Sequence, residues 1–128
     1  MSIFQKTALA AALALTSFIV PASAFAGYYG ALAFSQGSGA SGWSKNYETK
    51  REAARAALSY CRENSSSGDC KVVYEFTNSC AALAVGSENG YGVAWDVKKG
   101  RANKKAIAAC EGYDSGCSIV ISECSQGD

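Results

Sequence analysis

The chain has 128 residues, 48% of them hydrophobic, and its 12 Lys and Arg nearly balance its 11 Asp and Glu. This balance argues against bulk electrostatic attraction to nucleic acid or an anionic membrane, although it leaves room for a local charged patch. The absence of histidine removes the usual general base and zinc ligand, and with them the commonest hydrolase triads and zinc sites. We therefore expect no nucleic-acid partner, no metal and no cofactor.

The first 26 residues have the pattern of an export signal. Lys6 supplies the positive segment, Ala8 to Val20 the apolar segment, and Ala24-Phe25-Ala26 an A-x-A cleavage site, with a cut after Ala24 as the alternative. An apolar run of about 13 residues is shorter than the roughly 20 that a membrane-spanning helix needs, so we expect cleavage near Ala26 and no membrane anchor. The sequence therefore predicts a periplasmic or secreted protein, with residues 27–128 as one domain.

Two tandem units follow, each with the order β-β-α-β. In the first, residues 28–34 and 42–47 flank a turn rich in Gly and Ser, as in a hairpin. The predicted helix begins at Thr49 as N-cap, with Glu52 in a capping box, and residues 70–76 form a strand. The expected apolar stripe of this helix consists of Ala53, Ala56, Ala57 and Tyr60.

The second unit repeats this order. Ala82-Leu83-Ala84-Val85 resembles Ala31-Leu32-Ala33-Phe34, and Asn89-Gly90 is a strong hairpin signal. A strand over residues 91–97, a helix over residues 102–110 and a strand over residues 117–122 complete the unit. Because neither unit can bury its sheet alone, we expect an α+β fold in which units 28–79 and 80–124 pack as one pseudo-twofold domain stapled by three disulfides.

Strand alternation predicts which side chains share a face. The large or charged residues are expected on one face of each second strand, and the small residues opposite them are expected to face the helices. The first set comprises Trp43, Lys45 and Tyr47 in the first unit and Tyr91, Val93, Trp95 and Val97 in the second; the small set includes Ser44, Gly92 and Ala94.

Six cysteines in an exported chain indicate three disulfides, and the missing histidine and C-x-x-C spacing argue against metal binding. The repeat selects a pairing. Cys61 and Cys110 end helices while Cys70 and Cys117 begin the next strands, which predicts Cys61–Cys70 and Cys110–Cys117. The remaining Cys80 and Cys124 hold similar places in the two units, and groups related by a twofold axis can meet near it, which predicts Cys80–Cys124.

Two groups of charged residues are candidates for chemistry. Glu75 and Asp96 suggest a two-carboxylate hydrolase, but solvated or lysine-paired carboxylates are the favoured interpretation. A basic cluster lies near the start of the second helix, where the helix dipole disfavours cations. It suggests an anionic polymer or an acidic protein surface as partner, but the favoured interpretation is that these side chains are simply exposed to solvent at the helix start. The cluster comprises Lys98, Lys99, Arg101, Lys104 and Lys105.

Aromatic residues are the other candidates for binding. Core packing explains most of them, but an exposed group would suit contact with a protein or a glycan. Trp43 and Trp95 are expected to be partly exposed, and Tyr47 is a further candidate.

Several segments resemble the bacterial secreted family catalogued as domain of unknown function 4189. They are Tyr29-Gly30-Ala31-Leu32-Ala33, Gly42-Trp43-Ser44, Asp69-Cys70-Lys71-Val72-Val73, Asn78-Ser79-Cys80-Ala81-Ala82-Leu83-Ala84-Val85 and Tyr91-Gly92. The resemblance implies a small exported protein with paired cysteines and no catalytic motif. We expect a non-enzymatic binding module that engages a protein partner in the envelope, as inhibitors and immunity proteins do. A secreted effector acting outside the cell and a small carboxylate-dependent hydrolase are the alternatives.

Overall fold

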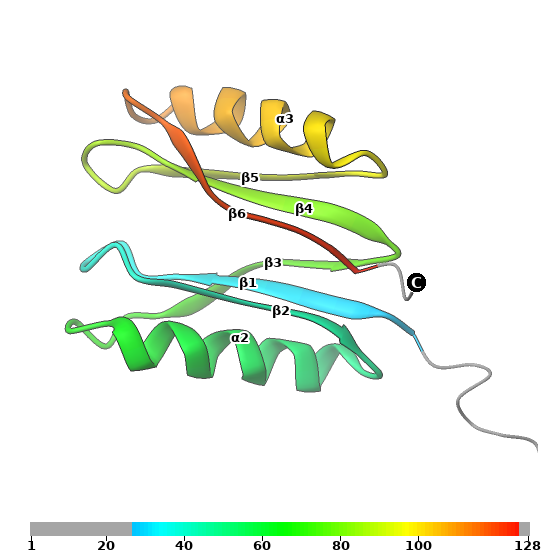
Figure 1. Ribbon diagram of the computed structural model, residues 1–128. Helices are drawn as coiled ribbons and strands as arrows, with labels where there is room; N and C mark the ends of the chain where they lie inside the picture. Colours follow the sequence, from blue (N-terminus) through cyan, green and yellow to red (C-terminus); the bar gives the residue numbers. More distant parts are fainter. Residues whose placement is uncertain (1–26, 126–128) are drawn as a thin grey trace, which may run out of the picture.

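The computed structural model describes residues 27–125 as four layers, helix on sheet on sheet on helix (Figure 1). The predicted export signal, residues 1–26, lies outside the described residues. The predicted order of elements is confirmed in both units. The first unit contains β1 (Tyr29–Phe34), β2 (Ser41–Tyr47), α2 (Lys50–Asn64) and β3 (Lys71–Thr77); the second contains β4 (Ser79–Val85), β5 (Tyr91–Asp96), α3 (Lys99–Glu111) and β6 (Ser118–Ser125).

Each unit forms its own antiparallel three-stranded sheet with its first strand in the centre. The strand orders are β2-β1-β3 and β5-β4-β6. The third strand of each unit also carries an irregularity at the same place, opposite Leu32 and Ala33 in one sheet and opposite Leu83 and Ala84 in the other. Because the strand order and this irregularity recur together, the predicted duplication is confirmed at the level of the backbone.

Two kinds of core separate the layers. Between the sheets, larger side chains such as Leu32, Phe34 and Leu83 form the main apolar cluster. Between each sheet and its helix the contacts consist mostly of alanine and cysteine, which lets the helix lie close to the sheet. The closest approaches are at Gly42 and Gly92, where an added Cβ would lie 2.3 Å and 2.2 Å from backbone atoms of α2 and α3. The prediction that small faces contact the helices is confirmed.

All three predicted disulfides form, but the reason given for the third is wrong. Cys61–Cys70 and Cys110–Cys117 join each helix to the next strand. Cys80 and Cys124 lie directly opposite each other on the neighbouring strands β4 and β6. The third disulfide therefore closes the second unit on itself and does not bridge a twofold axis between the units.

Helix α2 begins as predicted but turns a different stripe toward the sheet. The Glu52 backbone N–H donates to Thr49 Oγ1 at 3.1 Å, which confirms the cap. Ala53, Ala57 and Cys61 are buried, whereas Tyr60 is 51% exposed. The Cys61 side chain points toward the sheet, where its disulfide to Cys70 holds it, so the neighbouring Tyr60 points away from the core. Neither helix within residues 27–125 is long and apolar enough to cross a membrane.

Candidate functional site

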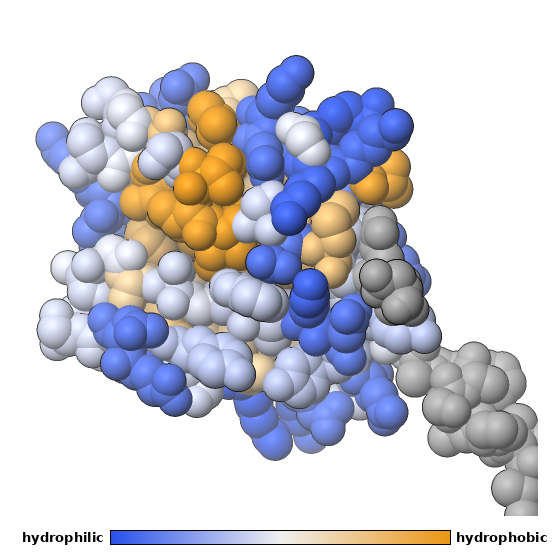
Figure 2. All heavy atoms as spheres, in the orientation of Figure 1, coloured by the Kyte–Doolittle hydropathy of each residue, from blue (hydrophilic) through white to orange (hydrophobic). Residues whose placement is uncertain are grey.

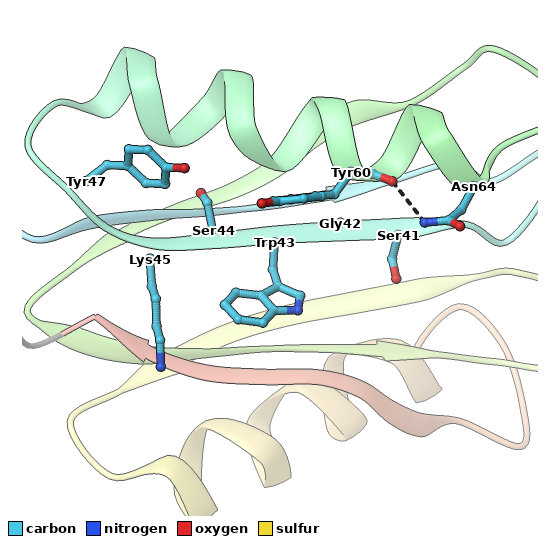
Figure 3. Close-up of a pocket in the computed structure, with 8 residues that line it drawn as sticks. All are labelled: Ser41, Gly42, Trp43, Ser44, Lys45, Tyr47, Tyr60 and Asn64. Atoms are coloured by element: carbon cyan, nitrogen blue, oxygen red, sulfur yellow. Dashed lines mark hydrogen bonds between the residues drawn. The ribbon is translucent and has the colours of Figure 1, made fainter.

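A hollow of about 420 Å³ runs along the outer edge of β2. Strand β2 is an edge strand of its sheet, so it has a partner strand on only one side. Figure 3 shows the tyrosines of the hollow on the α2 side of the strand, and Trp43 and Lys45 on the side of the second unit. The lining residues are Ser41, Gly42, Trp43, Ser44, Lys45, Tyr47, Tyr60 and Asn64.

The floor of the hollow is set by two small residues of β2. Gly42 has no side chain, which allows the backbone of α2 to lie against the strand. Ser44 Oγ donates a hydrogen bond to the Ala53 carbonyl of α2 at 2.6 Å, so its hydroxyl is satisfied and buried. The helix is thus fixed at the strand, and Tyr60 forms a wall of the hollow (Figure 3).

Tyr47 is on the opposite face of β2 from the one predicted. Ser44 pairs with Ala31 and Tyr47 with Tyr29, so β2 has one extra residue relative to β1. Asn46 accommodates it with a φ of 62°, a left-handed conformation that Asn tolerates better than most residues. Such a bulge reverses the strand alternation. Tyr47 therefore lies on the α2 side of β2, away from Trp43 and Lys45 (Figure 3).

Lys45 connects the β2 edge to the second unit, and Trp43 lies beside it on the same face of the strand (Figure 3). Lys45 Nζ lies 3.3 Å from Glu123 Oε1 on β6 and 5.9 Å from the centroid of the Trp43 ring. Trp43 is nevertheless 38% exposed. Strands β2 and β6 lie along the same side of the molecule (Figure 1), and Figure 2 shows apolar side chains gathered over β6, where Val120 is half exposed. This side therefore presents aromatic and aliphatic surface next to an open strand edge.

The second unit has a related hollow along β5. It measures about 530 Å³ and is lined by uncharged residues, among them Gly92, Val93 and Tyr113. Trp95, the other predicted binding residue on β5, is 50% exposed but is not part of this lining. The sequence analysis missed Tyr60 and Asn64 in the first unit and Tyr113 in the second. These residues come to lie beside a strand edge only through the way in which each helix and the turn after it pack on the sheet.

Part of the predicted basic cluster is neutralised by one carboxylate. Asp96 accepts from the Lys98 backbone N–H at 3.0 Å, and Arg101 Nε and Lys105 Nζ each lie 3.1 Å from it. The Lys98 N–H, followed by the two cationic side chains, lowers the pKa of Asp96 to about 2. Lys105 also lies 5.6 Å from the Trp95 ring centroid. The other lysines, Lys98, Lys99 and Lys104, form no ion pair with any residue in the described part of the chain.

Glu75 and Asp96 do not face each other. Glu75 pairs with Ala31, whose side chain packs toward α2, and Asp96 pairs with Cys80, which packs toward α3. Directly opposed residues of an antiparallel pair share a face, so the two carboxylates lie on the two outer faces of the sandwich, with both sheets between them. This arrangement removes the two-carboxylate site that these residues suggested.

Two other carboxylates, which the sequence did not single out, support the hairpin turns. Asp69 accepts hydrogen bonds from the hydroxyls of Ser35 and Ser67 and from the Gly37 N–H at 2.9 Å. These bonds, that of Ser35 foremost, lower the pKa of Asp69 to about 2.

Asp114 has the same role in the second unit. It accepts from the backbone N–H groups of Ser115, Glu88 and Gly90, at 2.7, 2.9 and 2.8 Å, and these bonds lower its pKa. Asp69 and Asp114 both lie in the segment that a short disulfide closes, so each unit uses this segment to hold its own β-turn. These carboxylates are engaged in structure.

Metal-ligating groups do not converge within residues 27–125. All six cysteines are joined in disulfides, and no three Cys, Asp or Glu side chains of this part are grouped so as to hold an ion.

Comparisons with known proteins agree with this architecture. The chain is similar to the NMR structure of Rv1813c from Mycobacterium tuberculosis, with a TM-score of 0.56 and 26% sequence identity, covering 77% of this chain and 75% of that one. No curated protein matches the chain. A family model matches residues 29–124, nearly all of the two units just described. The chain therefore belongs to the family described as Domain of unknown function (DUF4189).

Proposed function

We propose that this protein is an exported, non-enzymatic module that binds a protein partner through the open edge of β2. The observation that carries the proposal is the hollow along this edge, flanked by Trp43, Tyr47 and Tyr60, each at least one third exposed. Tyr and Trp are the residues that most often dominate protein contacts, because they bury a large area and have few rotatable bonds.

Export is supported by the covalent framework. Three disulfides in about 100 residues suit an oxidising compartment, and they would be hard to maintain among cytosolic thiols. The signal pattern of the first 26 residues agrees with this inference. The periplasm and the space outside the cell fit equally well.

A role in binding is supported by what the carboxylates do. Asp69, Asp96 and Asp114 hold backbone and side-chain groups of the fold, and their low pKa values suit fixed acceptors and not proton donors near neutral pH. With no histidine in the chain, the commonest alternative base is missing as well.

Affinity capture from envelope extract and from culture medium tests this proposal. The exported protein with its disulfides intact is compared with a Trp43→Ser, Tyr60→Ser variant and with Trp95→Ser as the matched control, because Trp95 is as exposed as Tyr60 but lies outside the β2 hollow. We expect a protein that wild type and control retain and that the double variant loses by at least tenfold. Equal retention by all three proteins would contradict a partner site at β2.

A further inference from the structure

We propose that β2 receives an extended segment of the partner as an added antiparallel strand. This inference rests on the proposed function and specifies how the site recognises its ligand. An edge strand directs the N–H and C=O groups of alternate residues away from its sheet, and such a row of groups can pair with another chain. Strand addition of this kind obtains affinity from the backbone and specificity from the side chains beside it.

The four edge strands differ in how well they can accept another strand. The third strands β3 and β6 are each interrupted by an irregularity in mid-strand, which disturbs the spacing of their backbone groups. Strand β2 is regular from Ser41 to Ser44, and its bulge comes only at the end. Strand β5 is also regular, but its hollow has no charged residue in its lining. β2 thus combines a regular edge with flanking aromatic rings and one cation.

The side chains around β2 define the segment that fits. Opposite Gly42 and Ser44 the added strand has room for large apolar or aromatic side chains, which would fill the hollow between Tyr47 and Tyr60. On the other face, a carboxylate opposite Lys45 would meet its ammonium group, whose side chain is 41% exposed despite the contact with Glu123. Cross-strand pairs of this kind stabilise antiparallel sheets.

A second copy of this chain fits the same edge poorly. In antiparallel pairing of β2 with itself, residues of one face meet residues of the same face. Within the regular stretch Ser41 to Ser44, Gly42 and Ser44 would therefore oppose only each other or themselves, and the hollow beside them on the α2 side would stay empty. Lys45 would meet Ser41, Trp43 or another Lys45, and none of these is a carboxylate. The partner segment we infer is thus a different chain, with alternating large apolar residues on one face and an acidic residue on the other.

A synthetic peptide tests the mode of binding directly. The probe is acetyl-Thr-Glu-Phe-Val-Leu-Thr-amide, which in antiparallel register places Glu opposite Lys45, Phe opposite Ser44 and Leu opposite Gly42. We expect the peptide to slow hydrogen exchange at the outward amides of residues 41–45 at least fivefold and to leave those of β5 unchanged. In a Trp95→Phe background, where Trp43 is the only tryptophan, its emission should shift to shorter wavelength.

Two controls separate strand addition from adhesion of an apolar peptide. Methylating the peptide nitrogens that face β2 should abolish protection, whereas methylating the alternate nitrogens should not. Lys45→Glu should weaken binding of the probe at least fivefold, and a probe with Lys in place of Glu should restore it.

Three results would overturn the inference. They are equal binding of both methylated peptides, no protection of residues 41–45 at a saturating probe concentration, and a β2-mediated dimer in sedimentation of the protein alone. If any of these results appears while capture of a partner still depends on Trp43 and Tyr60, the proposed function stands and strand addition is wrong. If capture is independent of these residues and the probe still protects β2, the proposed function is the part that fails.

Discussion

The two units have one backbone plan but are reinforced differently. The second unit contains two disulfides, and one of them joins Cys80 to Cys124 across the neighbouring strands β4 and β6. At the equivalent strand positions the first unit has Tyr29 opposite Thr77, and its one disulfide closes only the loop after the helix. The first unit instead carries a bulged second strand with tyrosines and Trp43 around an open edge.

On the proposed function, the duplication divides binding and covalent reinforcement between its two copies without a change of fold. The second unit is covalently the more constrained, and the first presents the larger aromatic wall. The contacts between β2 and β6, through Lys45 and Glu123 and through Ser125, connect the two.

Removing the disulfides should affect the two units unequally. The pair Cys80→Ala, Cys124→Ala opens a loop with a sequence separation of 44, whereas the Cys61–Cys70 and Cys110–Cys117 pairs span 9 and 7. Loop-closure entropy predicts losses of about 4 kcal/mol for the first pair and about 2.5 kcal/mol for each of the others. Urea unfolding of the three double variants measures these losses. Equal losses for all three pairs would remove the asymmetry.

Alanine at the glycines that contact the helices should damage both units alike. An added Cβ at Gly42 or Gly92 would meet helix backbone at 2.3 Å or 2.2 Å, so the helix must move outward. Overpacking of this kind costs about 2 to 3 kcal/mol of unfolding free energy. Chemical denaturation checks both variants. A tolerated Gly42→Ala beside a damaging Gly92→Ala would show that the two helices are not held equally.

The turn-holding carboxylates predict a common pH dependence. The folded pKa of Asp69 is lowered to about 2 and that of Asp114 is also lowered, from an ordinary value of 3.8. A lowered pKa stabilises the fold above the unfolded pKa, and this stabilisation is lost as the pH falls toward the folded pKa. We therefore expect Asp69→Asn and Asp114→Asn each to lower Tm at neutral pH, with the difference from wild type shrinking as the pH falls below about 4, and for Asp69 shrinking toward pH 2.

Glu75→Gln serves as the control for the two aspartates, because the Glu75 side chain is exposed and, within residues 27–125, accepts no hydrogen bond. Thermal unfolding followed by circular dichroism at several pH values provides the measurement. A deficit in Asp69→Asn that persists unchanged at pH 2 would mean that this carboxylate is not the acceptor holding the turn of the first unit.

The smallest expected effect is a gain. Gly100 lies in the first turn of α3, and apart from its chain neighbours and the nearby backbone of its own helix no atom lies within 4 Å of an added Cβ, so alanine fits there without a clash. Gly100→Ala should stabilise the protein by about 0.5 kcal/mol, because it restricts the unfolded chain. Urea unfolding compares it with Gly92→Ala in the same unit. A loss at Gly100 would show that the space around α3 is not as open as described.

The sequence predicts the framework well, because local patterns repeat. The capping residue Thr49, the Asn89-Gly90 turn and the positions of the cysteines are enough for the order of elements and for the two short disulfides. The pair Cys80–Cys124 follows from them only by elimination, because the sequence does not show that these residues face each other on adjacent strands. The site depends on features that alternation and helical periodicity do not carry. Tyr47 changes face because Asn46 adopts a positive φ, and Tyr60 is exposed because Cys61, one residue later, sets the helix phase. Both are decided by tertiary constraints on a single residue.

The division of tasks between the units is tested most directly by hydrogen exchange in the complex with a captured partner. Amides of β2 and β5 are compared in the free and bound protein, since these strands occupy equivalent edges of the two sheets. The account predicts protection of β2 over residues 41–45, with the exchange of β5 unchanged. Protection of β5, with β2 left as in the free protein, would contradict it.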